Sequence, residues 1–287
     1  NDFSQCKGNP IDIMSGVKIQ YEVDFESETS ELMKFVRVYD SKSGQWYFPY
    51  AKYSHQPNIK VISPVKTRSY SFSQGRVISL NIAKEIIQFT DSHLKTSHFI
   101  KNEYVNKYQP ITKNTKASML MQIDDMGESE EPQQEWVYID GLRKEVYNSN
   151  GFLKAIEFLN EKVTVSYSES EGKTFYVHNN GERFVLSNIN SNGKDFRLED
   201  ADGHTIKYEY EGDKLTAVIF SDGNKKTYHY ENVQFPYALT GITNELGVRF
   251  ATWSYDSLGR ANLSMHANNA ERYDFVYDTA NKKVIET

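Results

Sequence analysis

The feature that most constrains the fold is a turn sequence that returns at a nearly fixed interval through the second half of the chain. In the run Tyr255-Asp-Ser-Leu-Gly-Arg260, a strand-like segment ends in an aromatic residue and a glycine-containing turn follows at once. The interval between successive markers of this kind is 20, 22, 21, 20, 25 and 22 residues, the markers being Tyr147, Tyr167, Ile189, Tyr210, Tyr230, Tyr255 and Tyr277. A period of this size is typical of repeat architectures, in which each repeat is one small unit of secondary structure.

A second turn lies inside most intervals, so each repeat contains two strands and two turns. These second turns are Asn160-Glu161, Asn180-Gly181, Asp202-Gly203, Asp222-Gly223, Thr243-Asn244 and Asn268-Asn269. Asn, Asp and Gly suit tight hairpin loops because they tolerate a positive φ. Between the turns, as in Thr205–Tyr210, β-branched and aromatic residues alternate with charged ones. One hairpin cannot bury its apolar face alone, so we expect the repeats to pack on one another.

Composition supports a fold made of strands. Aromatic residues reach 14% of the chain, with 20 Tyr and 16 Phe against 3 Trp, while hydrophobic residues reach only 38%. Amphipathic rings favour sheets over a leucine-rich helical core. We therefore predict an all-β protein in which antiparallel β-hairpin repeats over residues 136–287 form a curved sheet or spiral, preceded by a β-rich N-terminal domain over residues 1–135.

Several segments of the N-terminal domain alternate clearly. Residues 17–25 form the clearest strand, with apolar residues on one face and Lys18, Gln20, Glu22 and Asp24 on the other. Further strands are expected at residues 33–39, 60–62, 69–72 and 76–80, the last two joined by a turn at Gly75. Residues 82–89 fit a short helix or a strand equally well. Residues 124–135 are acidic and contain Pro and Gly, which favours a loop or linker over a calcium site.

Within the repeats, residues 152–159 (FLKAIEFL) have helical spacing. Alignment with the sister repeats YEGDKLTAVI and YDSLGRANLS puts a strand at this position, and we expect the strand. The segment Asp200-Ala-Asp202-Gly203 resembles half of a calcium loop. Leu198 stands where the first carboxylate would be, so a hairpin turn is the better interpretation.

Charge and motifs disfavour several functional classes. The formal net charge is −6 and no run of basic residues is present, which disfavours nucleic-acid binding. No stretch is long and apolar enough for a transmembrane helix. His93 and His98 lack metal-ligand spacing, and the single cysteine, Cys6, is expected to be structural or incidental.

No motif for nucleophilic catalysis, phosphate binding or zinc hydrolysis is present. We expect no catalytic residues, cofactor or metal. A β-rich glycosidase with two carboxylates stays open, because its acid pair would be set by geometry alone.

One aromatic cluster is a candidate binding surface. Trp46, Tyr47 and Tyr50 follow a turn-like segment at the end of a strand. Such a cluster suits a platform for stacking on sugars, but it more often packs in the core or at a sheet edge.

The repeat turns resemble the YD repeats of the bacterial Rhs family, which also occur in teneurins and in the shell subunits of Tc-type toxin complexes. The likeness rests on Tyr255 to Arg260 and on the pattern Y-x-Y-[DE]-x-x-G-[RK]-L over residues 208–215. It departs from the family at Ala261, where Leu is usual, and at Ile189. Residues 8–24, which begin Gly-Asn-Pro-Ile, resemble the segment that opens the domain before the repeats in many Rhs proteins.

The resemblance implies a fold and a role. In Rhs proteins the repeats form a β-sheet spiral that closes into a shell around a C-terminal toxin domain, after a self-cleavage site. This chain ends ten residues after Tyr277, so we expect the N-terminal piece of such a protein, truncated within its repeats and without the self-cleaving segment or the toxin.

On this reading the turn residues Tyr210, Tyr230, Tyr255, Asp256, Gly259, Arg260, Tyr277 and Asp278 are structural. The partners are further repeats and an effector of the same polypeptide, and an open sheet edge at the C-terminus favours self-association.

We expect a secreted or cell-envelope location with a leader sequence already removed, or a cytoplasmic one before contact-dependent delivery. The alternative function is an extracellular module that binds carbohydrate or a cell surface through Trp46, Tyr47 and Tyr50.

Overall fold

The computed structural model describes residues 6–7, 11–48, 59–63, 66–71, 77–83, 85–90, 96–101, 107–111, 117–124, 133–188, 196–278 and 283–286. The prediction of an all-β protein is confirmed. Antiparallel strands make up almost all the regular structure of these residues, and the one helical element among them is a single 3-10 turn, η2 (Ala267–Asn269).

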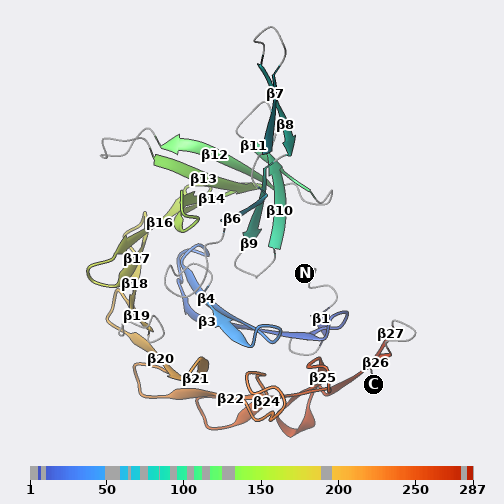
Figure 1. Cartoon of the computed structure of the whole chain (residues 1–287). Helices are drawn as coiled ribbons and strands as arrows, with labels where there is room; N and C mark the ends of the chain where they lie inside the picture. Colours follow the sequence, from blue (N-terminus) through green and yellow to red (C-terminus); the bar gives the residue numbers. More distant parts are fainter. Residues whose placement is uncertain are drawn as a thin grey trace.

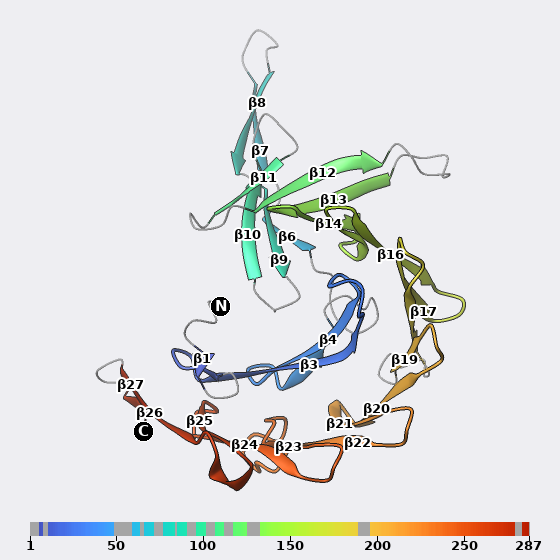
Figure 2. The ribbon, with the colours of Figure 1, turned by 180° about the vertical axis from the view of Figure 1, so that it is seen from behind.

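The N-terminal strands form a five-stranded sheet, which we call the inner sheet. Its strands, in order, are β1 (Cys6–Lys7), β2 (Ile11–Asp12), β3 (Val17–Glu26), β4 (Lys34–Asp40) and β5 (Gln45–Tyr47). The alternating segment after Gly16 is the long strand β3, as predicted. In Figures 1 and 2 the hairpin of β3 and β4 lies along the concave side of an arc made by the repeats.

One antiparallel ladder, which we call the outer sheet, holds nearly all the remaining strands. Its N-terminal part comprises β6 (Ile59–Ser63), β9 (Ile86–Thr90), β10 (Thr96–Lys101), β11 (Lys107–Pro110), β12 (Ser118–Asp124), β13 (Gln133–Asp140) and β14 (Arg143–Asn148). The ladder continues in chain order through β15 (Leu153–Phe158), β16 (Glu161–Ser168), β17 (Lys173–His178), β18 (Arg183–Asn188), β19 (Phe196–Asp200), β20 (Thr205–Glu211) and β21 (Lys214–Ile219). It ends with β22 (Lys225–His229), β23 (Gly241–Thr243), β24 (Arg249–Tyr255), β25 (Ala261–His266), β26 (Tyr273–Asp278) and β27 (Lys283–Glu286).

The outer sheet is curved and open. Among the described residues β6 pairs only with β9, and β27 pairs only with β26, so the two ends of the ladder do not meet. A separate hairpin of β7 (Lys66–Ser71) and β8 (Val77–Ala83) projects from the arc (Figure 1). The expected curved sheet of hairpins is therefore present.

The segments whose spacing also fitted a helix contain strands in the structure. The FLKAIEFL segment is the strand β15, as the repeat alignment indicates. Of the ambiguous residues 82–89, residues 82–83 end β8 and residues 86–89 belong to β9, while residue 84 lies outside the described residues. Of the acidic segment expected to be a loop, Asp124 ends β12 and residues 133–135 belong to β13, while residues 125–132 lie outside the described residues. The proposed domain division after residue 135 falls inside β13, and it stays a prediction.

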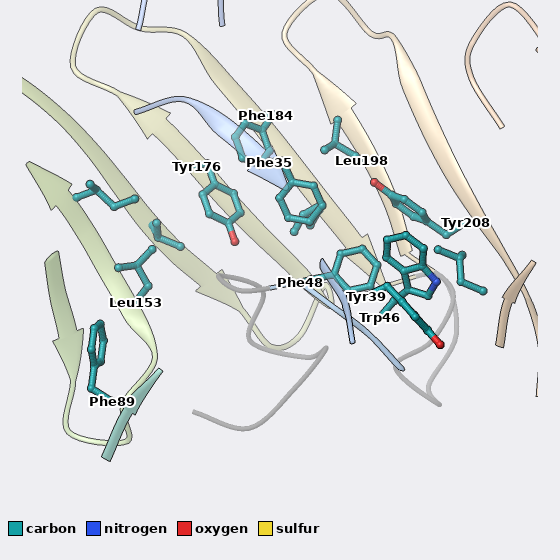
Figure 3. Close-up of a cluster of buried hydrophobic side chains, with 14 of the residues drawn as sticks. Phe35, Tyr39, Trp46, Phe48, Phe89, Leu153, Tyr176, Phe184, Leu198 and Tyr208 are labelled. Carbon is teal, nitrogen blue, oxygen red and sulfur yellow. The ribbon is translucent and has the colours of Figure 1, made fainter. Parts of the chain in front are cut away.

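From the sequence we expected the repeats to pack on one another, but they do not cover one another's apolar faces. Neighbouring repeats are joined edge to edge by strand pairing, and the inner sheet covers their concave face. Figure 3 shows Phe35, Tyr39, Trp46 and Phe48 of the inner sheet among rings of the outer sheet. The ring of Phe35 lies 5.9 Å from that of Phe184. Aromatic pairs of this kind add about 0.5–1.5 kcal/mol each beyond the burial of their area, so the two sheets share one core.

Candidate functional site

The Tyr-Asp turn lies on one edge of the outer sheet, between β24 and β25, and its tyrosine ties neighbouring strands together. The Tyr255 hydroxyl donates a hydrogen bond of 2.8 Å to the Leu239 carbonyl, which precedes the adjacent strand β23. The same bond recurs from Tyr167 to Leu153 (2.6 Å), from Tyr230 to Leu215 (2.9 Å) and from Tyr277 to Ala261 (2.6 Å). Each hydroxyl therefore bonds the backbone near the start of the neighbouring strand, just after the turn of the preceding repeat.

Burial widens the pH range over which two of these hydroxyls stay neutral. Burial raises the pKa of Tyr255 well above its ordinary value. Burial also raises the pKa of Tyr277 to about 12. A neutral phenol is a donor, which is the role that the carbonyl acceptors require.

The other residues of the signature close the turn. The Asp256 carboxylate accepts hydrogen bonds from the backbone N–H groups of Leu258 (2.9 Å) and Arg260 (3.0 Å). Gly259 has φ of +78°, a conformation that favours glycine. The Arg260 guanidinium donates to Asp256 at 2.8 Å and lies 4.4 Å from the ring centre of Tyr277 in the next repeat.

The electrostatics of Asp256 follow from these contacts. Burial acts to raise the pKa of Asp256, but hydrogen bonds from Arg260 and Leu258 outweigh burial and hold the pKa below its usual value. The charge of Asp256 is therefore used to close the turn and to position Arg260.

The same hairpin geometry recurs at other turns of the outer sheet. Asn148, Asp200 and Asn244 each accept the backbone N–H groups two and four residues later. Tyr210 lies at a β-bulge, as Tyr255 does. Asp278 ends β26, and its side chain lies outside the described residues. The residues of the Tyr-Asp turn therefore serve to close the turns and to join the repeats.

We expect Tyr255→Phe to lower the free energy of unfolding by about 1–3 kcal/mol, because the Leu239 carbonyl loses its donor. Urea denaturation measures this loss. The matched control is Tyr237→Phe, since Tyr237 is exposed and no hydrogen bond from its hydroxyl is present among the described residues. Equal stability of the two variants would contradict a tie between repeats.

The aromatic cluster proposed for sugar stacking does not form a surface platform at Trp46. This side chain is only 8% exposed, and its Nε1 donates a hydrogen bond of 2.9 Å to the Tyr230 hydroxyl. Its ring lies 4.9 Å from that of Tyr228, in the core between the two sheets. Tyr47 is half-buried on β5, and Tyr50 lies outside the described residues. Core packing, the commoner fate of such a cluster, is what Trp46 shows.

A group of buried charges joins the inner and outer sheets, and the sequence did not predict it. Arg37 of β4 forms a double hydrogen bond with Asp24 of β3, at 2.5 and 2.8 Å, and both side chains are at most 2% exposed. From the outer sheet, the Tyr208 hydroxyl donates to Asp24 at 2.7 Å, and Arg37 donates to the Tyr228 hydroxyl at 2.9 Å. Burial lowers the pKa of Arg37, but Asp24 and the two tyrosines outweigh it and raise the pKa above its ordinary value.

The polar face of β3 belongs to the same junction. Lys18 is fully buried, with its Nζ 4.2 Å from the ring centre of Trp253 and 2.7 Å from the Gln20 amide oxygen. Glu22 pairs with Lys226 of the outer sheet at 2.9 Å. The run of four alternating polar residues on β3 was the available signal, but their partners lie about 200 residues further along the chain.

The remaining candidate groups carry no further chemistry. Asp200, Asp202 and His204 have ligand atoms within 4.8 Å of one another. Asp200 already accepts two backbone N–H groups and contacts His204 Nδ1 at 3.0 Å, which supports the turn interpretation. His98 is exposed, and His93 lies outside the described residues.

The fold and this junction define a protein class, an open sheet of antiparallel hairpin repeats that curves around an inner sheet. No protein-family model matches the chain, and no curated protein sequence matches it significantly. Among the described residues, no helix has the length and apolar character needed to cross a membrane.

Proposed function

We propose that this chain is a non-catalytic scaffold or shell portion of a larger Rhs-like protein. The observation that carries the proposal is the use of the repeat signature. Tyrosine, aspartate, glycine and arginine of the Tyr-Asp turn all act in holding the turn or joining one repeat to the next. Contacts that recur from one repeat to the next can extend a sheet by any number of repeats.

The open outer sheet supports the same proposal. Among the described residues, β27 pairs with β26 on one side only. An unpaired edge is a template for a further strand. In the proposed function, further repeats of the same polypeptide take this place, and the completed shell encloses or displays a C-terminal effector of a secreted or cell-envelope toxin.

The proposal can be tested by adding one strand to the ladder. The strand β27 has the same place in its repeat as β25 has in the preceding repeat. Residues 267–278 form the turn after β25 and the next strand, β26, so a copy of them is placed after Thr287. We expect the melting temperature to rise by about 2–4 °C for each kcal/mol that the new interface adds.

The control is an extension of equal length made of glycine and serine. Because it cannot pair with β27, it should leave the melting temperature unchanged. An equal response to the two extensions would overturn the scaffold proposal, since the outer sheet would then have no capacity to grow by repeats.

A further inference from the structure

One repeat is longer than the others, and its extra residues form one wall of a cleft. The interval from Tyr230 to Tyr255 is the longest, at 25 residues. The excess lies in residues 230–240, a loop between β22 and β23 that replaces a tight turn. Insertions in repeat proteins map to loops on one face, which is often the binding face.

The cleft lies between this loop, two turns of the inner sheet and the Tyr-Asp turn. Its volume is about 550 Å³, and its walls are residues 15–17, 41–44, 234–238 and 258–260. That volume is within the usual range for binding sites. The cleft is therefore large enough to hold several residues of a peptide or a small molecule.

Close contacts hold the walls in place. A Cβ on Gly16 would lie 2.4 Å from the Arg260 Cβ, and one on Gly44 would lie 2.5 Å from the Tyr237 Cβ. The Ala261 N–H donates to the Gly16 carbonyl at 2.8 Å. The buried Tyr39 hydroxyl donates to the Tyr237 carbonyl at 2.8 Å, which anchors the loop. A cleft shaped before binding lowers the cost of ordering on binding.

The charged side chains that line the cleft are both basic. No Asp or Glu lines it, while Lys42 and Arg260 do, in a protein with a formal net charge of −6. Arg260 is committed to Asp256. Lys42 is exposed, and among the described residues its ammonium group forms no ion pair within 4.0 Å. Burial raises the pKa of the Asp40 carboxyl, and Lys42 lies close enough to that carboxyl to act to lower its pKa. Complementarity therefore favours an anionic occupant that meets Lys42.

The rim of the cleft is apolar. Leu258 is 68% exposed and Tyr237 45% exposed, and both line the cleft. Val233 is 97% exposed on the same loop. Grouped large apolar side chains on a surface mark interaction sites.

The polar lining favours a peptide over a saccharide. The Ser15 hydroxyl donates to Asp12, the Ser43 hydroxyl donates to the Asp40 carbonyl, and the Gln234 amide donates to the Ser257 carbonyl. These groups are occupied within the protein, so few donors are left to read sugar hydroxyls. Aliphatic rim residues and one exposed cation suit acidic and aliphatic side chains instead.

We propose that this cleft binds an acidic peptide segment that carries aliphatic side chains. Lys42 pairs with a carboxylate of the peptide, and Tyr237 and Leu258 contact its aliphatic groups. The proposal does not depend on the scaffold role, because it rests on the loop of one repeat and not on growth of the ladder.

The test uses fluorescence polarisation with the whole chain and a labelled octapeptide that alternates glutamate with leucine. We expect saturable binding that weakens as salt is raised. Lys42→Glu should weaken binding at least about tenfold by reversing the charge that meets the carboxylate. Lys207→Glu, an exposed change on β20 away from the cleft, is the matched control and should leave binding unchanged.

Three results with the peptides would overturn the proposal. They are no saturable binding of the acidic peptide, equal binding of an octapeptide alternating lysine with leucine, and equal affinity of the parent chain and Lys42→Glu. Labelled oligogalacturonate tests the saccharide source of carboxylates, and tighter binding of this probe than of the peptide also counts against a peptide site. Equal melting temperatures of the parent and both variants establish that folding is not the cause.

Discussion

Replacing Arg37 by alanine is expected to lower the free energy of unfolding by about 3–5 kcal/mol. The change leaves the Asp24 carboxylate buried without its cation and removes the donor to the Tyr228 hydroxyl. The guanidinium also lies 4.9 Å from the ring centre of Trp46, so packing between the two sheets is lost as well. Urea denaturation followed by tryptophan fluorescence measures the loss, because Trp46 and Trp253 both lie at the junction.

A second ion pair of the same geometry provides the control. Arg272 forms a double hydrogen bond with Asp274 at 2.6 and 2.9 Å, but the Arg272 side chain is half exposed. Arg272→Ala should cost far less stability than Arg37→Ala, because solvent screens an exposed pair. Similar losses in the two variants would show that the Arg37 pair does not hold the inner sheet in place.

A single added methyl group at Gly16 is expected to lower the free energy of unfolding by about 2–5 kcal/mol. Gly16 has φ of +71°, which costs about 1–2 kcal/mol for a residue with a Cβ. The new Cβ would also lie 2.4 Å from the Arg260 Cβ and 3.1 Å from its Cα. Backbone cannot move aside cheaply, so the turn of the inner sheet must leave the Tyr-Asp turn.

Gly212→Ala separates the two contributions. Gly212 has φ of +61° in a repeat turn, and a Cβ there would meet nothing within 4 Å. It should show only the backbone cost, about 1–2 kcal/mol. Hydrogen exchange at the Ala261 N–H, which donates to the Gly16 carbonyl, should accelerate in Gly16→Ala alone. If both alanine variants lose the same stability and protect Ala261 equally, the docking of the two turns is not a stabilising contact.

Local chemistry made much of the outer sheet predictable. Each repeat turn needs an acceptor for two backbone N–H groups and a residue that tolerates positive φ, and Asp256 and Gly259 meet those needs within four residues. The repetition of this pattern also outweighed the helical spacing of residues 152–159, which form β15. A period of about 21 residues therefore led to an all-β ladder of hairpins.

The position of the aromatic cluster was less predictable. Trp46 at the end of a strand fits either a surface platform or a core, because its own neighbours in sequence are the same in both cases. Its burial depends on Tyr228 and Tyr230, which lie more than 180 residues away. Local periodicity contains no information about contacts with residues so distant in the sequence. The cleft beside Lys42 is set in the same manner, since its walls come from three turns and one loop that are far apart in the chain.

The sequence by itself determined the hairpins and turns of the repeats, because hydrogen bonding within a hairpin joins residues that are close in the chain. Only the tertiary structure decided what covers the concave face. Strand alternation places Lys18 and Glu22 on one side of β3, but it does not say which side meets water. Both are buried, because Trp253 and Lys226 of the outer sheet face them across the junction. Contacts between residues about 200 positions apart have no period in the sequence, and they hold the inner sheet against the repeats.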